Sequence, residues 1–332
     1  IKIYPSFQIN SYIITWVVDG TESTTEQNFG TSINKPEDPE KEGYTFKGWS
    51  LTENGAIVDV TTMTVPANNN TKFYAVFAGD DHVAYTVNKY FMNTSGTYEG
   101  VEAEPETLYG VAGEKATYTP AAPEGFTFDA TQANKLTGTI AGNGSLELAV
   151  YYSRNKVSVT INDKTEEKYY GEIIEEPTVT PEGDPGYSFK EWVYEDDKPV
   201  EFPVTVGTDP IVIKPSFEAD TDTEYTIKTY TMGLDGEYGE AVITKGTGTT
   251  DKEATYTAPV IEGFTADKTS YTVVVKGDDS DVIEVYYSRN KNDLVYTVDG
   301  KADTTVPTFY GAAIDGTVQP KAIPAGFDFL GW

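Results

Sequence analysis

The sequence has 332 residues, 38% of them hydrophobic, with no cysteine and one histidine. Its 24 lysine and arginine residues against 53 aspartate and glutamate residues give a formal charge of −29, which repels phosphate backbones and anionic membranes. These values exclude Cys/His metal clusters, thiol nucleophiles and repeated Ser-His-Asp triads, and they argue against nucleic-acid binding. No run of about 18 apolar residues occurs, so no membrane insertion is predicted within this segment.

Residues 1–10 are predicted to form one strand. Their opening, IKIYPSF, aligns with IVIKPSF at residues 211–217, and Phe7 corresponds to Phe217. The later segment closes a repeat that we call B-type, so residues 1–10 are interpreted as the last strand of a preceding B-type repeat. This favours an excerpt from a longer tandem array. The alternative is that the first strand of one molecule completes the last repeat of the next.

Residues 11–80 are predicted to form a B-type repeat. Hydrophobic side chains alternate along residues 12–18, and the Asp-Gly pair that follows predicts a hairpin turn. An aromatic-Gly step, two prolines, the heptapeptide GYTFKGW (43–49) and the strand KFYAVF (72–77) come next. Because proline blocks ladder pairing, the proline stretch is predicted to be an ordered crossover.

Residues 81–155 are predicted to form a repeat of a second kind, which we call M-type. It opens with the strand YTVNKYFMN at residues 85–93 and closes with the hexapeptide YYSRNK at residues 151–156. Alternate hydrophobic residues in its last strand, 148–152, share one face.

The two patterns then recur along the chain. A motif written once per repeat is typical of packing, because a catalytic motif is needed once per active site. The predicted units are a B-type repeat at 156–220, with GYSFKEW; an M-type repeat at 221–290, with an identical YYSRNK; and an incomplete B-type repeat at 291–332, which ends in GFDFLGW.

These motifs carry two family resemblances. The B-type repeats, through their turn, aromatic-Gly step, prolines and G-[YF]-x-F-x-[GE]-W heptapeptide, resemble the Listeria-Bacteroides repeat, also called the internalin B repeat. The M-type repeats, through Y-T-[VI] and [VI]-Y-Y, resemble mucin-binding-protein repeats. The resemblances imply small β-grasp (ubiquitin-like) modules, in tandem on bacterial surface proteins that include wall-anchored adhesins, and they imply no catalysis. We therefore predict a mainly β chain with little helix, arranged as an elongated array of beads on a string.

One tryptophan ends each heptapeptide: Trp49, Trp192 and Trp332. Each is predicted to cap the core of its repeat, since an indole supplies one of the largest apolar areas available to a small module. The alternative is a carbohydrate-binding face on which the rings stack against sugars.

Arg154 and Arg289 are the two arginines of the chain, and both lie in YYSRNK where an M-type repeat meets a B-type repeat. The planar guanidinium grips carboxylates or backbone oxygens, so these residues are predicted to set the angle between neighbouring repeats. The alternative is that they are solvated linker residues shared by duplication.

Acidic clusters at Asp80-Asp81, at Asp220 with Asp222, and at residues 278–281 are the candidate cation sites. Asp278, Asp279 and Asp281 carry oxygen ligands of the type that Ca²⁺ prefers, although the spacing of an EF-hand loop is absent. Solvated turns are the alternative interpretation. No catalytic residue, no residue that binds a cofactor and no metal ligand beyond these weak candidates is predicted.

The predicted function is structural. We expect a stalk or spacer region of an extracellular, wall-anchored bacterial surface adhesin-like protein, with neighbouring repeats of the same chain as its partners and no enzymatic activity. Two alternatives remain open: that the M-type repeats bind a host or matrix glycoprotein or glycan such as mucin, and that the chain is a subunit of a filament or surface layer that associates end to end.

Overall fold

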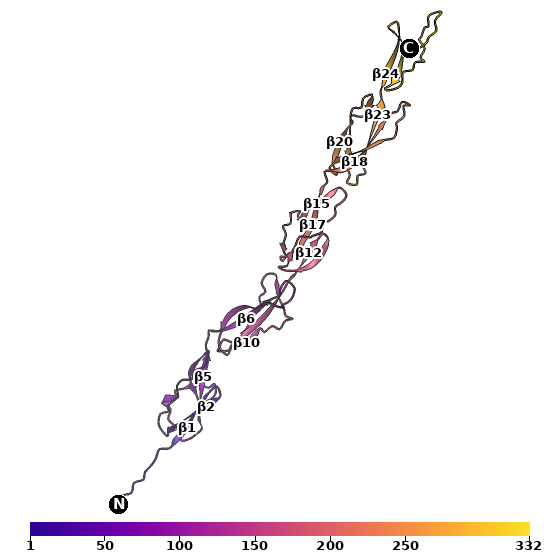
Figure 1. The fold of residues 1–332 in the computed structure, drawn as a ribbon. Coiled ribbons are helices and arrows are strands. Elements are labelled where there is room, and N and C mark those ends of the chain that lie inside the picture. The colour runs from indigo at the N-terminus through magenta and orange to yellow at the C-terminus, as the bar shows by residue number, and fades with distance from the viewer. The chain divides into compact units, whose positions relative to one another are not determined.

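The computed structural model describes residues 1–332 and consists mainly of β-strands in small sheets that follow one another along the sequence (Figure 1). It contains no α-helix, and its helical segment is the three-residue 3-10 turn η1 (Val60–Thr62). No helical segment could cross a bilayer. The prediction of a mainly β chain of small tandem sheets with little helix is confirmed. The β-grasp assignment stays a prediction.

The chain divides into two compact units. The first comprises Ile1–Val159, Glu166–Ile174 and Pro203–Ile211, and the second comprises Thr160–Thr165, Glu175–Phe202 and Val212–Trp332. The six-part division predicted from the sequence is finer than this one and stays a prediction.

The first sheet of the first unit has the order β2-β1-β5-β3-β4, with β1 and β5 parallel at its centre. The predicted hairpin turn between β1 and β2 is present, because Asp19 and Gly20 have φ values of 47° and 79°, as a tight turn of this kind requires. The strands are β1 (Ser11–Val18), β2 (Thr21–Asn28), β3 (Tyr44–Ser50), β4 (Ile57–Val58) and β5 (Thr71–Gly79).

The core of this sheet is aromatic and lies on one face. Alternation along β1 places Ile14 and Trp16 on the same face, where Phe73 of β5 stacks on Trp16 with ring centroids 5.0 Å apart. Ile33, just before the prolines, and Val60 of η1 pack against this face. The buried residues of the cluster are Ile14, Trp16, Ile33, Trp49, Val60, Val65 and Phe73.

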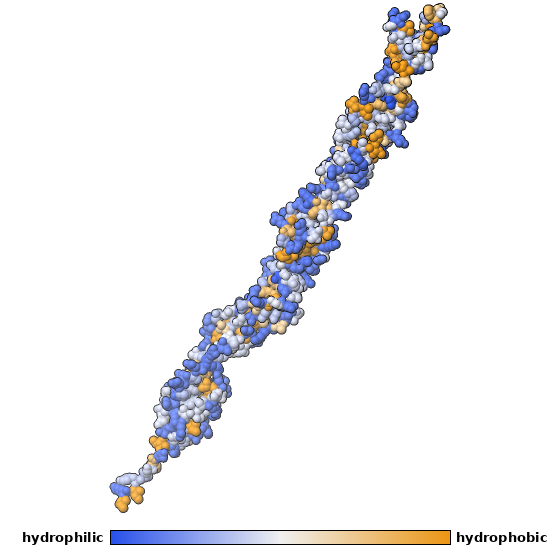
Figure 2. Space-filling view, in the orientation of Figure 1, coloured by the Kyte–Doolittle hydropathy of each residue, from blue (hydrophilic) through white to orange (hydrophobic).

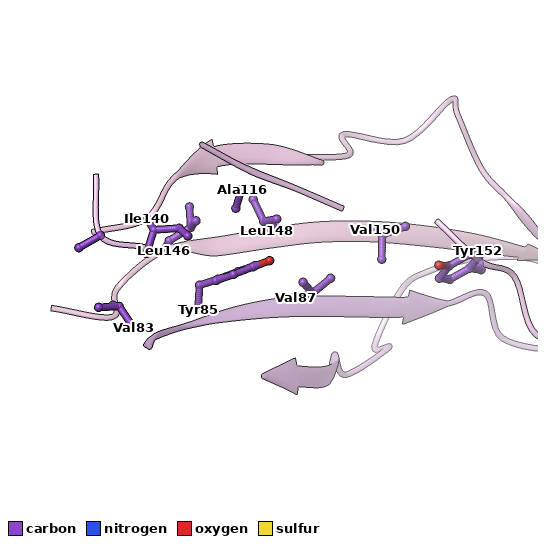
Figure 3. Packing of buried hydrophobic residues seen from close by; sticks show 10 residues of the cluster. Val83, Tyr85, Val87, Ala116, Ile140, Leu146, Leu148, Val150 and Tyr152 are labelled. Atoms are coloured by element: carbon purple, nitrogen blue, oxygen red, sulfur yellow. The ribbon is translucent and has the colours of Figure 1, made fainter. Parts of the chain in front are cut away.

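A second sheet of the first unit has the order β7-β6-β11-β9, again with a parallel central pair, β6 and β11. The alternate side chains of these two strands point toward one another and toward Ile140 and Ala116 (Figure 3). A two-stranded sheet, β8 with β10, lies over them. The strands are β6 (Val83–Phe91), β7 (Glu104–Gly110), β8 (Lys115–Thr117), β9 (Phe126–Phe128), β10 (Thr137–Thr139) and β11 (Glu147–Arg154).

The stretch 156–220 contributes strands to both units. In the first unit β14 (Ile173–Ile174) pairs with β16 (Val204–Thr205). In the second unit β15 (Tyr187–Tyr194) pairs with β17 (Ile211–Ala219) and carries the same register shift inside its heptapeptide as β3. The remaining strands are β12 (Lys156–Ile161) and β13 (Lys164–Tyr169).

The second unit also contains a sheet of order β19-β18-β23-β21, whose central pair β18 and β23 is parallel. Its core repeats that of the earlier M-type sheet, with Ile227, Val285 and Tyr287 at alternate buried positions. The strands are β18 (Thr223–Thr231), β19 (Val242–Gly248), β20 (Glu253–Thr257), β21 (Phe264–Ala266), β22 (Ser270–Val274) and β23 (Val282–Arg289).

The two ends of the sequence are less paired. Residues 291–332 contribute only the hairpin of β24 (Lys291–Val298) with β25 (Lys301–Phe309). Residues 1–10 form no strand, because no other strand lies beside them to share hydrogen bonds. Their assignment as the closing strand of a B-type repeat stays a prediction.

Candidate functional site

The tryptophans of the heptapeptides occupy two kinds of environment. Trp49 and Trp192 are 3% and 5% exposed, so neither indole can stack on a sugar. Trp49 meets Trp16 edge to face with ring centroids 4.8 Å apart. Trp332 departs from the prediction, because it is 43% exposed. Residues 291–332 contain no counterpart of β5, the strand that pairs with the Trp49 strand, and this missing cover leaves the ring accessible.

The passage from an M-type to a B-type repeat is organised by an arginine. Strands β11 and β12 are separated by a single residue, Asn155. Nε of Arg154 donates to the carbonyl of Met92 over 2.6 Å, and Nη1 donates to the carbonyl of Tyr170 over 2.7 Å. The guanidinium also lies 4.9 Å from the centre of the Phe126 ring, a cation–π distance. One side chain therefore ties the end of β6 to the aromatic-Gly step of the following repeat.

Arg289 makes the same three contacts in the second unit. Its Nε and Nη1 donate to the carbonyls of Met232 and Tyr310 over 3.0 and 2.9 Å, and its guanidinium lies 4.6 Å from the Phe264 ring centre. Although the chain is strongly acidic, neither arginine forms an ion pair. We call the two sets of contacts the arginine junctions.

A tyrosine completes each arginine junction. The ring of Tyr170 lies against Gly125 so closely that a Cβ there would overlap it, and Tyr310 covers Gly263 in the same way. Both glycines also have positive φ. The aromatic-Gly step recurs in the B-type repeats, and Gly-Phe-Thr recurs at residues 125–127 and 263–265, but neither pattern by itself predicts this contact. Their recurrence in every arginine junction was the available signal.

The connection between a B-type repeat and the M-type repeat that follows it is held by the backbone groups of an aspartate. The amide of Asp80 donates to the carbonyl of Gly43 over 2.9 Å, and its carbonyl accepts from the amide of Ala112 over 3.0 Å. Its carboxylate accepts from the Thr45 hydroxyl over 2.7 Å. Asp80 therefore hydrogen-bonds to both neighbouring repeats.

Asp220 repeats this arrangement in the second unit. Its amide donates to Gly186 over 2.8 Å, its carbonyl accepts from Thr250 over 2.9 Å, and its carboxylate accepts from Ser188 over 2.5 Å. We call these contacts the aspartate junctions.

Glycines allow the backbones to meet at the aspartate junctions. Gly43 faces Gly142, and a Cβ on Gly142 would overlap the carbonyl of Glu42. In the second unit Gly186 faces Gly277 with the same consequence for the Pro185 carbonyl. These glycine pairs were not predicted, because the partners lie far apart in the sequence and no local pattern links them.

The acidic residues near 280 are not gathered around one point. Asp281, 8% exposed, has a carboxylate oxygen 3.2 Å from Nζ of Lys276 and also accepts from the Lys276 amide over 2.5 Å. Asp278 accepts from the amide of Ser280, and hydrogen bonds from Ser280 lower the pKa of Asp278. In residues 1–332 no group of three or more His, Asp or Glu side chains is placed to hold a metal ion, so Asp278, Asp279 and Asp281 are not brought together as ligands.

Three tyrosines recur on the sheet face opposite the core of each M-type repeat. Tyr90 and Tyr151 stack with ring centroids 4.6 Å apart, and Tyr98 meets Tyr151 edge-on at 5.2 Å. The second copy has corresponding distances of 4.7 and 5.2 Å. We call these sets the tyrosine trios; the second consists of Tyr230, Tyr238 and Tyr286.

Comparison with known proteins supports the B-type prediction. Residues 12–76 match the family described as the Listeria-Bacteroides repeat domain, which confirms the predicted resemblance over that stretch. The chain is 37% identical over 83 residues to Internalin H of Listeria monocytogenes, covering 25% of this chain and 15% of the relative. It is 30% identical over 217 residues to a protein of Evansella cellulosilytica named "Putative Gly-rich membrane protein", covering 59% of this chain and 23% of the relative.

The chain thus spans less than a quarter of the length of either relative, and neither printed name is that of an enzyme. Among solved structures, the one titled "Crystal structure of Mub-RV" is similar, with 14% identity, a TM-score of 0.17, and coverage of 62% of this chain and 98% of that chain. At this TM-score the similarity carries no argument about the fold or the ligand of the M-type repeats.

Proposed function

We propose that this chain is the structural spacer region of a bacterial cell-surface repeat protein, a stalk that presents a ligand-binding domain away from the cell. The observation that carries the proposal is the recurrence of the junctions. The same backbone carbonyls and amides are used at each arginine junction and at each aspartate junction. A protein whose role is to hold distance needs defined contacts between successive repeats, and this chain makes the same contacts at both junctions of each kind.

In a spacer the repeated motifs hold the structure together and catalyse no reaction. The heptapeptide tryptophans of the two complete B-type repeats are buried, and both arginines are occupied by backbone carbonyls. The similarity to Internalin H and to the Evansella relative supports an extracellular location on a bacterial surface, with anchorage provided by other parts of a longer protein.

The spacer role is tested by placing the chain between a wall anchor and a reporter domain on a bacterial surface. The measurement is binding of a bulky antibody to the reporter, compared with a flexible Gly/Ser linker of equal length. We expect the native chain to give higher binding than the linker, because its junctions resist collapse. Equal binding by the two would overturn the spacer proposal.

A second candidate function is glycan binding by the M-type repeats. It is favoured by the tyrosine trios, which gather three aromatic rings on the sheet face opposite the core, with Tyr238 39% exposed, as a sugar-stacking surface would. The test is a glycan array probed with the full chain and with the Tyr98→Ala, Tyr238→Ala double variant. Glycan binding by the native chain that the double variant loses would support this function. If the native chain binds no glycan, the spacer role is the one that remains.

A further inference from the structure

The second tyrosine trio contains two rings that are held in contact across the central strands of its sheet. Tyr230 of β18 and Tyr286 of β23 are directly opposite each other in the parallel register. Their rings stack with centroids 4.7 Å apart and planes 7° apart, and both side chains are half-buried. Because β18 and β23 each have a neighbouring strand on both sides, the backbone fixes the two rings in this arrangement.

A single carboxylate serves the hydroxyls of both rings. The hydroxyl of Tyr230 donates to Oε1 of Glu284 over 3.3 Å, and the hydroxyl of Tyr286 donates to Oε2 over 3.2 Å. Burial of the rings and the Glu284 carboxylate raise the pKa of both phenols, so each hydroxyl keeps its proton at neutral pH. Glu284 is exposed and can exchange protons with water. Stacking alone would not require a carboxylate shared between the two hydroxyls.

The first unit contains the same ring pair without the carboxylate. Tyr90 and Tyr151 are directly opposite each other, and their rings stack with centroids 4.6 Å apart and planes 13° apart. Two residues before Tyr151 the sequence has Ala149, at the position that Glu284 occupies relative to Tyr286. A methyl group accepts no proton, so the two copies differ in the one group that could act as a base.

We propose that Tyr230 and Tyr286 form a site of oxidative modification, at which a peroxidase acting with hydrogen peroxide joins the two rings by a carbon–carbon bond and Glu284 accepts the hydroxyl protons. Each phenol loses one electron and its hydroxyl proton, which leaves two tyrosyl radicals. The two electrons and two protons reduce one hydrogen peroxide molecule to two water molecules. Glu284 takes each proton in turn and releases it to water between the two oxidations.

The two radicals then combine within the stacked pair. The new bond joins one carbon of each ring, next to the carbon that bears the oxygen. The hydrogen on each joined carbon moves to the oxygen of its ring by way of water, which restores both phenols. The product is a dityrosine that has lost two hydrogen atoms in all. Contact between the rings favours this pairing over reaction with a tyrosine elsewhere, because no encounter by diffusion is needed.

The cross-link would fix β18 to β23, the parallel pair at the centre of the sheet. A covalent bond between residues so far apart in the sequence restricts the unfolded chain and so stabilises the folded sheet. Hydrogen peroxide is soluble in water, and the visible surface of the chain is largely hydrophilic (Figure 2). The modification goes beyond the spacer role and does not depend on it.

The test is to treat the full chain with a haem peroxidase and hydrogen peroxide and to follow dityrosine fluorescence. Mass spectrometry after trypsin digestion then identifies the linked peptides. We expect peptide 229–245 joined to peptide 277–289, with a mass two hydrogen atoms below their sum. The initial rate at this pair should be at least about tenfold higher than at Tyr90 and Tyr151, because only the second copy has a base in contact with the hydroxyls.

Three variants of the full chain identify the groups involved, with circular dichroism to check that each is folded. Tyr230→Phe keeps the ring and should abolish this cross-link, whereas Tyr238→Phe, the control in the same peptide, should leave it. Glu284→Gln keeps the shape of the side chain but is a far weaker base, so the rate should fall at least about tenfold. Cross-linking at Tyr90 and Tyr151 should be unchanged in all three variants.

Absence of the linked peptides from the oxidised native chain would overturn the proposal. A cross-link between the same peptides that persists in Tyr230→Phe, or that is lost in Tyr238→Phe, would also overturn it, because another tyrosine would then be the reactive one. A native rate in Glu284→Gln would overturn the role of the carboxylate and with it the site as proposed. The spacer role is tested separately, because antibody access to the reporter is measured on the unoxidised chain.

Discussion

Removing the guanidinium of Arg154 is the most direct test of the arginine junction. In Arg154→Ala the carbonyls of Met92 and Tyr170 lose their donors. A hydrogen bond from a charged donor contributes about 1.5–3 kcal/mol. Both bonds are only partly buried, so water replaces part of this, and we expect the junction to open more easily by about 2–3 kcal/mol in total.

Hydrogen exchange of single amides measures that opening. The amide of Tyr170 donates to Asn155, and the amide of Asn155 donates to Gly125, so both report on the junction. A loss of about 2–3 kcal/mol corresponds to exchange about 30- to 150-fold faster at these amides. Amides in the middle of β6 should keep their protection, because their ladder is untouched.

Two further variants sharpen the experiment. Lys47→Ala changes the net charge equally, and Lys47 is exposed and distant in sequence from the junction, so it should leave the two amides unchanged. Arg289→Ala should have a smaller effect, because its bonds are longer and the one to Tyr310 is exposed. If Arg154→Ala changes exchange at Tyr170 and Asn155 by less than twofold, the arginine does not hold the junction and our reasoning fails.

Four other expectations follow from the structure. Trp49→Ala should cost about 3–5 kcal/mol in denaturant unfolding of its repeat, whereas Trp332→Ala should cost much less because that indole is 43% exposed; equal losses would contradict the assigned core. Gly142→Ala should lower the thermal midpoint because its Cβ would meet the Glu42 carbonyl, and Gly207→Ala, with open space around it, is the control. Burial raises the pKa of Tyr152 and of Tyr271 to about 12, from an ordinary value of 10.0, and a hydrogen bond to Asp267 contributes to the shift at Tyr271. The stabilisation from these two neutral hydroxyls should therefore be complete below pH 10 and decline as the pH rises from 10 toward 12. A circular-dichroism titration that is flat across that window would contradict this expectation. Calcium or a chelator should leave the thermal midpoint unchanged, because Asp281 is already paired with Lys276, and a shift of several degrees would revive the calcium alternative.

Local patterns in the sequence predicted the strands well. Alternation over residues 12–18 and the Asp-Gly turn define β1 and its hairpin, because side-chain period and backbone φ are properties of neighbouring residues. Repetition of the heptapeptide and of YYSRNK indicated the tandem sheets, because a motif that recurs along the sequence marks a structural unit that recurs. The positions of Arg154 and Arg289 at the ends of β11 and β23 also follow from where YYSRNK lies in the sequence.

Contacts between distant residues could not be predicted in this way. Nothing near Arg154 indicates that Met92 and Tyr170 supply its acceptors, since these depend on how two repeats meet. The contact of Gly43 with Gly142 is another case. The sequence shows that each position lacks a side chain, but it does not show which distant backbone lies against it. Trp332 shows the reverse: its motif predicts a core residue, but burial requires a closing strand that residues 291–332 do not contain.

The parallel pairing at the centre of each complete M-type sheet has a mechanical consequence. Strand β6 opens its repeat and β11 ends it, and the two lie side by side in the same direction. Tension applied at the two ends of this repeat would therefore pull the strands lengthwise past each other, loading the whole ladder at once instead of unzipping one bond after another. The same holds for β18 and β23, so each repeat should yield only at high force, a property suited to a tether under flow.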